Sequence, residues 1–89
     1  MKDKRSKLDN KIYDVIFFND DITTMEFVVR VLMQIFGKSH FKAEIIMRRV
    51  HEEGEGIVGS YIHEIAGQKK IETTALAEQE NFPLKVLIK

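Results

Sequence analysis

Three consecutive polar residues, Asn19, Asp20 and Asp21, directly follow an apolar run that ends at Phe18. The residues from Thr23 onward have the composition of a helix start, so the polar triplet is predicted to form a turn between a strand and a helix. Such a turn holds amide and carboxylate oxygens at a rigid edge, where they can face a ligand. These oxygens can accept hydrogen bonds from a charged amine, or they can bind a divalent cation.

His51, near the end of a predicted second helix, is another candidate for binding chemistry. A free α-amino group needs about three acceptors in a partly dry pocket, and Asn19, Asp20 and a neutral His51 could supply them. Each has a simpler explanation as well. The triplet can satisfy its own turn and the helix N-terminus, and His51 can bind the last carbonyls of its helix. The pattern alone leaves both interpretations open.

The composition excludes several classes of function. The chain has 89 residues, 44% of them hydrophobic, which is enough for one small domain with a single site. Fourteen basic and fourteen acidic residues balance, so we expect no binding to nucleic acid or to a membrane surface. The absence of cysteine removes disulfides, thiolate metal sites and thiol catalysis. With no apolar run of membrane-spanning length and no signal-peptide core in residues 1–11, we expect a cytoplasmic monomer.

The charge distribution divides the chain into two parts. Residues 1–11 contain five basic and two acidic side chains, which give a net charge of +3, whereas the remainder carries −3. A segment of this kind buries little apolar surface, so we expect a flexible charged tail over 1–11 and a folded domain over 12–89.

The periodicity of the folded part predicts six elements. Residues 12–18 form a strand, Thr23 and Glu26 form the capping box of a helix that begins near Thr24, and Gly37 ends that helix. Ser39 caps a second helix that ends near Gly54. A strand over 56–62, a helix over 64–80 and a strand over 84–88 follow. We therefore predict a two-layer α+β domain, with a three-stranded antiparallel sheet covered by three helices in the order β-α-α-β-α-β.

Three segments together resemble one known family. The sequences NDDITTMEFV and MRRVH and the final Pro-Leu strand are similar to the ClpS family, the bacterial adaptors that present N-degron substrates to Clp proteases. The resemblance runs from about Ile12 to Lys89. It implies a binding module that is not an enzyme and needs no cofactor or metal. Its partners would be N-degron peptides and proteins and a hexameric unfoldase.

The resemblance also implies roles for individual residues. Asn19 and His51 would contact the substrate's α-amino group, and Asp20 would add negative charge and a direct or water-mediated hydrogen bond. The side-chain pocket would be formed by Asp21, Thr23, Met25, Val28, Met47, Val50 and Leu84. Such a pocket is expected to prefer N-terminal Leu, Phe, Tyr and Trp, with Met25 at the gate position that disfavours β-branched Ile and Val.

A second surface would deliver the substrate. By resemblance, Glu64 and Lys69 at the start of the last helix contact the N-terminal domain of the unfoldase, either ClpA or a ClpC-like relative. Gly67 departs from the family pattern, because some members carry an acidic residue there. Thr24 also departs, replacing a frequent proline at the first helical position. The family uses its N-terminal extension during handover, which would give the tail over 1–11 a role.

Two other interpretations compete with this one. Asp20, Asp21 and His51 could form a hydrolytic metal site, since two carboxylates and an imidazole are suitable ligands. Alternatively, the chain could be a structural interaction domain like the C-terminal part of the ribosomal stalk protein, which resembles ClpS in fold. Such a domain would bind through a helical surface and would need no site for an amine.

Overall fold

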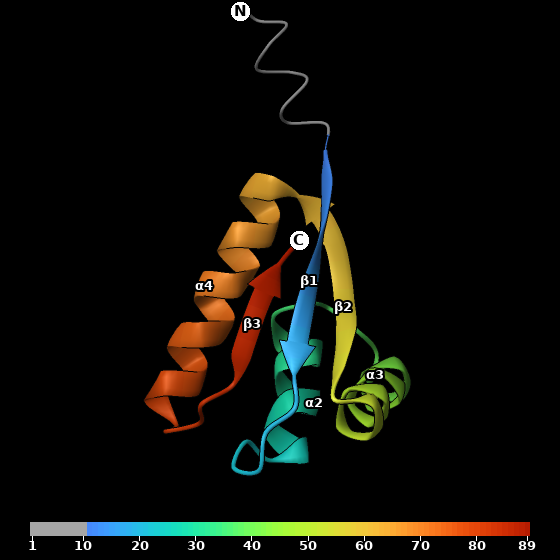
Figure 1. Ribbon diagram of the computed structural model, residues 1–89, viewed down its shortest axis with the longest axis vertical. Coiled ribbons are helices and arrows are strands. Elements are labelled where there is room, and N and C mark those ends of the chain that lie inside the picture. Colours follow the sequence, from blue (N-terminus) through green and yellow to red (C-terminus); the bar gives the residue numbers. More distant parts are fainter. Residues whose placement is uncertain (1–10) are drawn as a thin grey trace, which may run out of the picture.

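A computed structural model describes residues 11–89 and confirms the predicted fold class and element order. The elements are β1 (Ile12–Phe18), α2 (Met25–Gln34), α3 (His40–Glu53), β2 (Glu55–Ile62), α4 (His63–Gln79) and β3 (Lys85–Ile88). In Figure 1, α4 runs beside β3, and the turn after β1 leads into α2 at the lower end of the view. The predicted tail lies, apart from Lys11, outside the described residues.

The sheet has the order β2-β1-β3, and both pairs of neighbouring strands are antiparallel. β1 is the central strand, and its consecutive residues Val15, Ile16 and Phe17 are all buried. The register between β1 and β2 shifts after Val15, which pairs with Gly59 while Ile16 pairs with Ile57. β1 ends at Phe18, and the polar turn begins with the next residue, Asn19.

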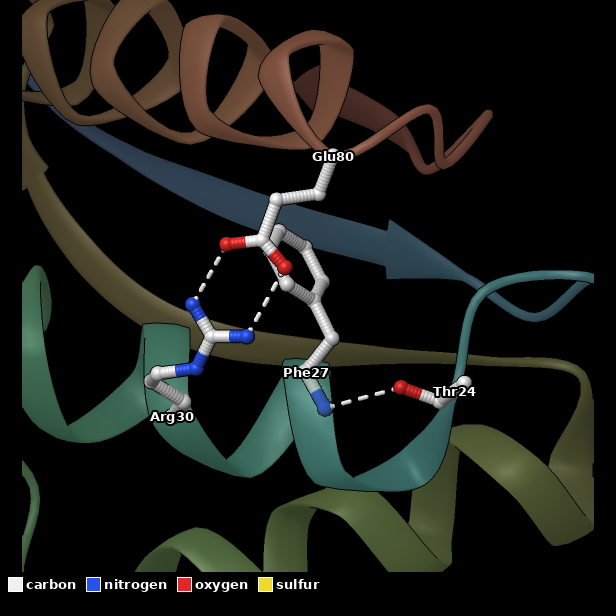
Figure 2. A network of polar contacts seen from close by, with 4 residues as sticks. All are labelled: Thr24, Phe27, Arg30 and Glu80. Atoms are coloured by element: carbon white, nitrogen blue, oxygen red, sulfur yellow. Dashed lines mark hydrogen bonds and ion pairs between the residues drawn. The ribbon is translucent and has the colours of Figure 1, made fainter.

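The start of α2 differs by one residue from the prediction. Thr24 is the N-cap, and its hydroxyl oxygen accepts a hydrogen bond from the Phe27 amide at 3.1 Å (Figure 2). The predicted capping box with Thr23 as the cap is therefore wrong, because the Thr23 hydroxyl donates to Asp20 instead. Thr24 thus precedes the first helical position, so the comparison with a proline at that position does not apply.

The predicted ends of α3 are confirmed by its caps. The Ser39 hydroxyl oxygen accepts from the Lys42 amide at 3.2 Å, as expected for an N-cap serine. Gly54 ends the helix with a φ of 90°, a left-handed conformation that glycine adopts without a side-chain clash. The chain then enters β2 at once, so the last turn of α3 lies beside the end of β1 that β2 pairs with.

An ion pair joins α2 to the end of α4. The Arg30 guanidinium donates to both carboxylate oxygens of Glu80, at 2.6 and 2.9 Å (Figure 2). Arg30 also lies 5.3 Å from the centre of the Phe27 ring, which packs against Phe82 at 4.9 Å. The hydrogen bonds between the partners raise the pKa of Arg30 and lower that of Glu80, so both groups are charged at neutral pH. This contact links α2, whose first turn carries part of the site, to the C-cap of α4.

Candidate functional site

The turn after β1 and the last turn of α3 meet around a single cavity. The backbone N–H of Asn19 donates to the backbone carbonyl oxygen of Gly54 at 2.9 Å, and this hydrogen bond joins the two segments. Beside it lies a cavity of about 330 Å³, which we call the turn pocket. Its lining residues are Asn19, Asp20, Asp21, Ile22, Thr23, Thr24, Met25, Val28, Met47, Val50 and His51. The polar triplet and His51, far apart in sequence, therefore face one space.

Asp20 organises the polar side of the turn pocket. One of its carboxylate oxygens accepts from the amides of Ile22 and Thr23, at 2.8 and 2.6 Å, and the other accepts from the Thr23 hydroxyl at 2.8 Å. Burial raises the pKa of Asp20, but these three hydrogen bonds together outweigh it and leave the pKa below its ordinary value. The carboxylate is therefore ionised and fixed at neutral pH, and it retains capacity to accept a further hydrogen bond.

The side chains of Asn19 and His51 are free to bind a ligand. Both are exposed at the mouth of the turn pocket. Within residues 11–89, neither side chain makes a hydrogen bond to the protein. An amide oxygen and an imidazole nitrogen with unused acceptor capacity, next to an ionised carboxylate, suit a positively charged donor.

The opposite side of the turn pocket is apolar. Val28, Met47 and Val50 line it while belonging to the hydrophobic core, with at most 9% of each residue exposed. Because these residues come from two packed helices, the wall is held in place before any ligand arrives. Met25 stands at the rim with 47% of its surface exposed, so its unbranched side chain has more freedom to move than these three.

One predicted wall residue lies elsewhere. Leu84 is 7% exposed and packs in the hydrophobic core just before β3, and it does not line the turn pocket. Its assignment to the side-chain pocket stays a prediction that the geometry of the cavity does not support. Ile22 and Thr24 line the turn pocket without having been predicted to do so. Their positions between Asp21 and Met25 in the same turn were the only available signal.

The two residues predicted to contact an unfoldase differ in their surroundings. Glu64 is exposed in the first turn of α4. The Lys69 ammonium instead donates to the Ile35 carbonyl oxygen at 2.6 Å, beyond the last turn of α2. It also lies about 6 Å from the centres of the Phe36 and Tyr61 rings, where cation-π attraction helps to hold it. Lys69 thus links α4 to the C-terminal end of α2, a role that its sequence position did not indicate.

Two further findings concern other classes of site. In the part of the chain that the structure describes, no cluster of three or more His, Asp and Glu side chains has a geometry that could hold a metal ion. The metal-site interpretation thus finds no support there. No helix among residues 11–89 is long and apolar enough to cross a bilayer.

Comparison with known proteins gives a consistent result. A family model described as ATP-dependent Clp protease adaptor protein ClpS matches residues 9–87. The ATP-dependent Clp protease adapter protein ClpS of Desulforapulum autotrophicum is 51% identical over 74 residues, which cover 83% of this chain and 71% of the relative. The ClpS of Campylobacter jejuni is 44% identical over 78 residues, covering 88% and 81%. The structure of Agrobacterium tumefaciens ClpS2 bound to L-phenylalaninamide aligns with a TM-score of 0.85 at 34% identity, covering 89% of this chain and 95% of that one.

Proposed function

Because the chain belongs to the ClpS family of ATP-dependent Clp protease adaptor proteins, we propose that its turn pocket recognises the first residue of N-degron substrates. The ligand would be a free α-amino group together with a bulky apolar side chain. The observation that carries this proposal is the composition of the turn pocket, where Asn19, Asp20 and His51 lie opposite the apolar wall.

The polar side of the turn pocket matches the needs of an ammonium group. An ammonium has three N–H donors, and each must find an acceptor once water is excluded. The amide oxygen of Asn19 and the imidazole of His51 would accept two of them. The ionised Asp20 carboxylate would accept the third, directly or through a water, and would balance the charge. L-phenylalaninamide, the ligand of the Agrobacterium ClpS2 structure, carries both a free α-amino group and an apolar side chain.

The apolar wall would take the first side chain of the substrate. Full burial of a Leu or Phe side chain contributes roughly 1.5 to 3 kcal/mol, which is too little for tight and selective binding without the ammonium contacts. Asp21 and Thr23 would border this space, while Val28, Met47 and Val50 would form its floor. We propose that Leu, Phe, Tyr and Trp fit and that Met25, at the rim, disfavours a second branch at Cβ, as in Ile and Val.

Delivery would use a surface away from the turn pocket. We propose that Glu64 and Lys69 at the start of α4 dock on the N-terminal domain of ClpA or of a ClpC-like unfoldase. Glu64 is exposed and available for an ion pair. Lys69 is held by the Ile35 carbonyl, so it would either act in that position or exchange this hydrogen bond for one to the partner. A Lys69→Ala variant with unchanged peptide affinity but weaker unfoldase binding would support this assignment.

A peptide titration tests the proposed first-residue specificity. Fluorescence anisotropy is measured for four peptides that differ only in their first residue, which is Leu, Phe, Ile or Ser. Leu and Phe should bind at least about ten-fold more tightly than Ser, because Ser lacks the apolar side chain. Ile should bind weakly in the wild type and gain affinity in Met25→Ala. Equal binding of all four peptides, or no binding at all, would contradict the proposal.

A further inference from the structure

A second and larger cavity lies in the groove between α2 and α3. It measures about 420 Å³, and we call it the methionine groove. Its lining residues are Met25, Glu26, Val29, Arg30, Met33, Gln34, His40, Glu44 and Met47. Neither the family resemblance nor the proposed first-residue site gives this cavity a role.

The methionine groove contains every methionine of residues 11–89, namely Met25, Met33 and Met47. Met25 and Met33 are 47% and 40% exposed, although burying them would be favourable. Unbranched thioether side chains adapt to ligands of different shapes, and for this reason they are over-represented on surfaces that bind many partners. A protein that must bind substrates of unrelated sequence needs a surface of this kind.

The methionine groove adjoins the turn pocket. Met25 and Met47 line both cavities, so the two share part of their walls. From Met25 to Met33 the helix rises about 12 Å, which equals the length of three to four extended residues at roughly 3.3 Å each. A chain whose first residue occupies the turn pocket can therefore lay its next residues along the methionine groove.

Of the charged side chains that border the methionine groove, Glu26 is exposed in the first turn of α2, and the others have partners. Arg30 is bound through both its terminal nitrogens to Glu80, and His40 lies 3.6 Å from Glu44. Val29 packs against the core and forms part of the floor. In an extended peptide the side chains of residues 1 and 3 point to the same side. Residue 3 is therefore the one directed back toward the protein.

We propose that the methionine groove is a second subsite that binds an apolar side chain at the third residue of the substrate. This inference rests on the proposed function, because it requires the first residue to be held in the turn pocket. It extends the recognised feature from a single residue to a short N-terminal segment, in which the first residue is required and the third adjusts the affinity.

The test compares peptides that begin Phe-Ser-Leu-Ser or Phe-Ser-Ser-Ser with L-phenylalaninamide, which has no third residue. Isothermal titration calorimetry of the wild type should give about five-fold tighter binding of the Leu peptide than of the Ser peptide, since an open groove buries only part of a Leu side chain. In Met33→Glu this ratio should fall to about one, because the new carboxylate opposes burial of an apolar group. Met33 does not line the turn pocket, so L-phenylalaninamide should bind the variant unchanged.

Ile71→Glu is the matched control, because it adds the same charge at an apolar residue that is 69% exposed on α4. It should leave the five-fold ratio intact. A wild-type ratio near one, or a ratio that Met33→Glu does not change, would overturn the second subsite. Failure of L-phenylalaninamide to bind the wild type would instead contradict the proposed function, so the two failures are distinguishable.

Discussion

Polar side chains near α2 serve opposite purposes in two regions of this molecule. At one, Arg30 and Glu80 are fully engaged with each other and hold α2 against the end of α4. At the other, the side chains of Asn19 and His51 have no hydrogen-bond partner within residues 11–89 and face a cavity with an apolar wall. The engaged groups stabilise the fold, whereas the unengaged groups are available to a ligand.

Asp20 belongs to both categories. Its carboxylate accepts three hydrogen bonds from its own turn, which fixes its position, yet it also lines the turn pocket with a full negative charge. The comparison shows how a small domain places charge beside a ligand site without leaving that charge mobile. The following predictions test whether the two regions differ as described, from the largest expected effect to the smallest.

Removing the imidazole should damage binding without damaging the fold. We expect His51→Ala to weaken binding of a Phe-initiated peptide by at least about ten-fold, because a substrate N–H donor is left without its acceptor. Fluorescence anisotropy measures the affinity, and circular dichroism verifies the fold. His63→Ala is the matched control, since the His63 ring contacts the Tyr13 ring edge to face, with 5.0 Å between the ring centres, and does not line the turn pocket. Equal losses in the two variants would contradict a direct role for His51.

The charge on Asp20 should persist through mildly acidic pH. Against the effect of burial, the hydrogen bonds from Thr23 and Ile22 hold the pKa of its carboxyl below the ordinary value, so its contribution to peptide affinity is lost only as pH falls through the acidic range. Peptide affinity of His51→Ala, which has no imidazole at position 51, should therefore be flat between about pH 7.5 and 5.5 when measured by fluorescence anisotropy. A loss of affinity over this range in that variant would argue against the assignment of Asp20.

Breaking the ion pair between Arg30 and Glu80 should lower stability and leave peptide binding nearly unchanged, the reverse of the result expected for His51→Ala. We expect Arg30→Ala to lower the melting temperature by about 2 to 4 °C, because the pair is partly exposed and screened by water. Affinity for L-phenylalaninamide should stay within about two-fold of wild type. The lowered pKa of Glu80 also means that the stabilisation is present at neutral pH and is lost as pH falls through the acidic range. If Arg30→Ala lost most of its binding while its melting temperature stayed that of the wild type, the ion pair would serve the site and not the fold.

Thr73 has the smallest expected effect on peptide binding and supplies a useful limit to the comparison. Its hydroxyl is fully buried on α4 and has no hydrogen-bond partner among residues 11–89, and it lines neither the turn pocket nor the methionine groove. An unpaired buried hydroxyl is a cost, so Thr73→Val should raise the free energy of unfolding by about 1 kcal/mol. Urea denaturation measures this change, and peptide affinity should not move. Destabilisation by the substitution would indicate that the hydroxyl has a partner.

The sequence predicted the elements well because each has local signals. Ser39 and Gly54 cap α3 as expected from their types, with a φ of 90° at Gly54. Gly37 has the expected left-handed conformation, with a φ of 66°, but α2 already ends at Gln34 with Ile35 as its C-cap, so the predicted helix end is too late. The cap of α2 was misplaced because Thr23 and Thr24 are equally suitable by type. The choice between them is made by Asp20, which binds the Thr23 hydroxyl and leaves Thr24 to cap the helix.

Contacts between distant segments were beyond sequence reasoning. The partners Arg30 and Glu80 are 50 positions apart, and Lys69 and Ile35 are 34 apart, so no periodicity pairs them. The meeting of Asn19 with the end of α3 was expected only from the family resemblance, and it depends on a backbone hydrogen bond that no side chain encodes. The methionine groove escaped notice because the resemblance assigned Met25 and Met47 to the side-chain pocket alone, and no local pattern places Met33 beside Met47.

The central claim is that the polar side of the turn pocket binds a free, charged α-amino group. Its most direct test is the affinity of one Phe-initiated peptide before and after acetylation of its amine, measured by fluorescence anisotropy on the wild type. Acetylation removes the charge, adds bulk and leaves buried acceptors unpaired at about 1 to 3 kcal/mol each. The account therefore predicts that the affinity falls at least about a hundred-fold on acetylation. An acetylated peptide that binds as tightly as the free one would contradict it.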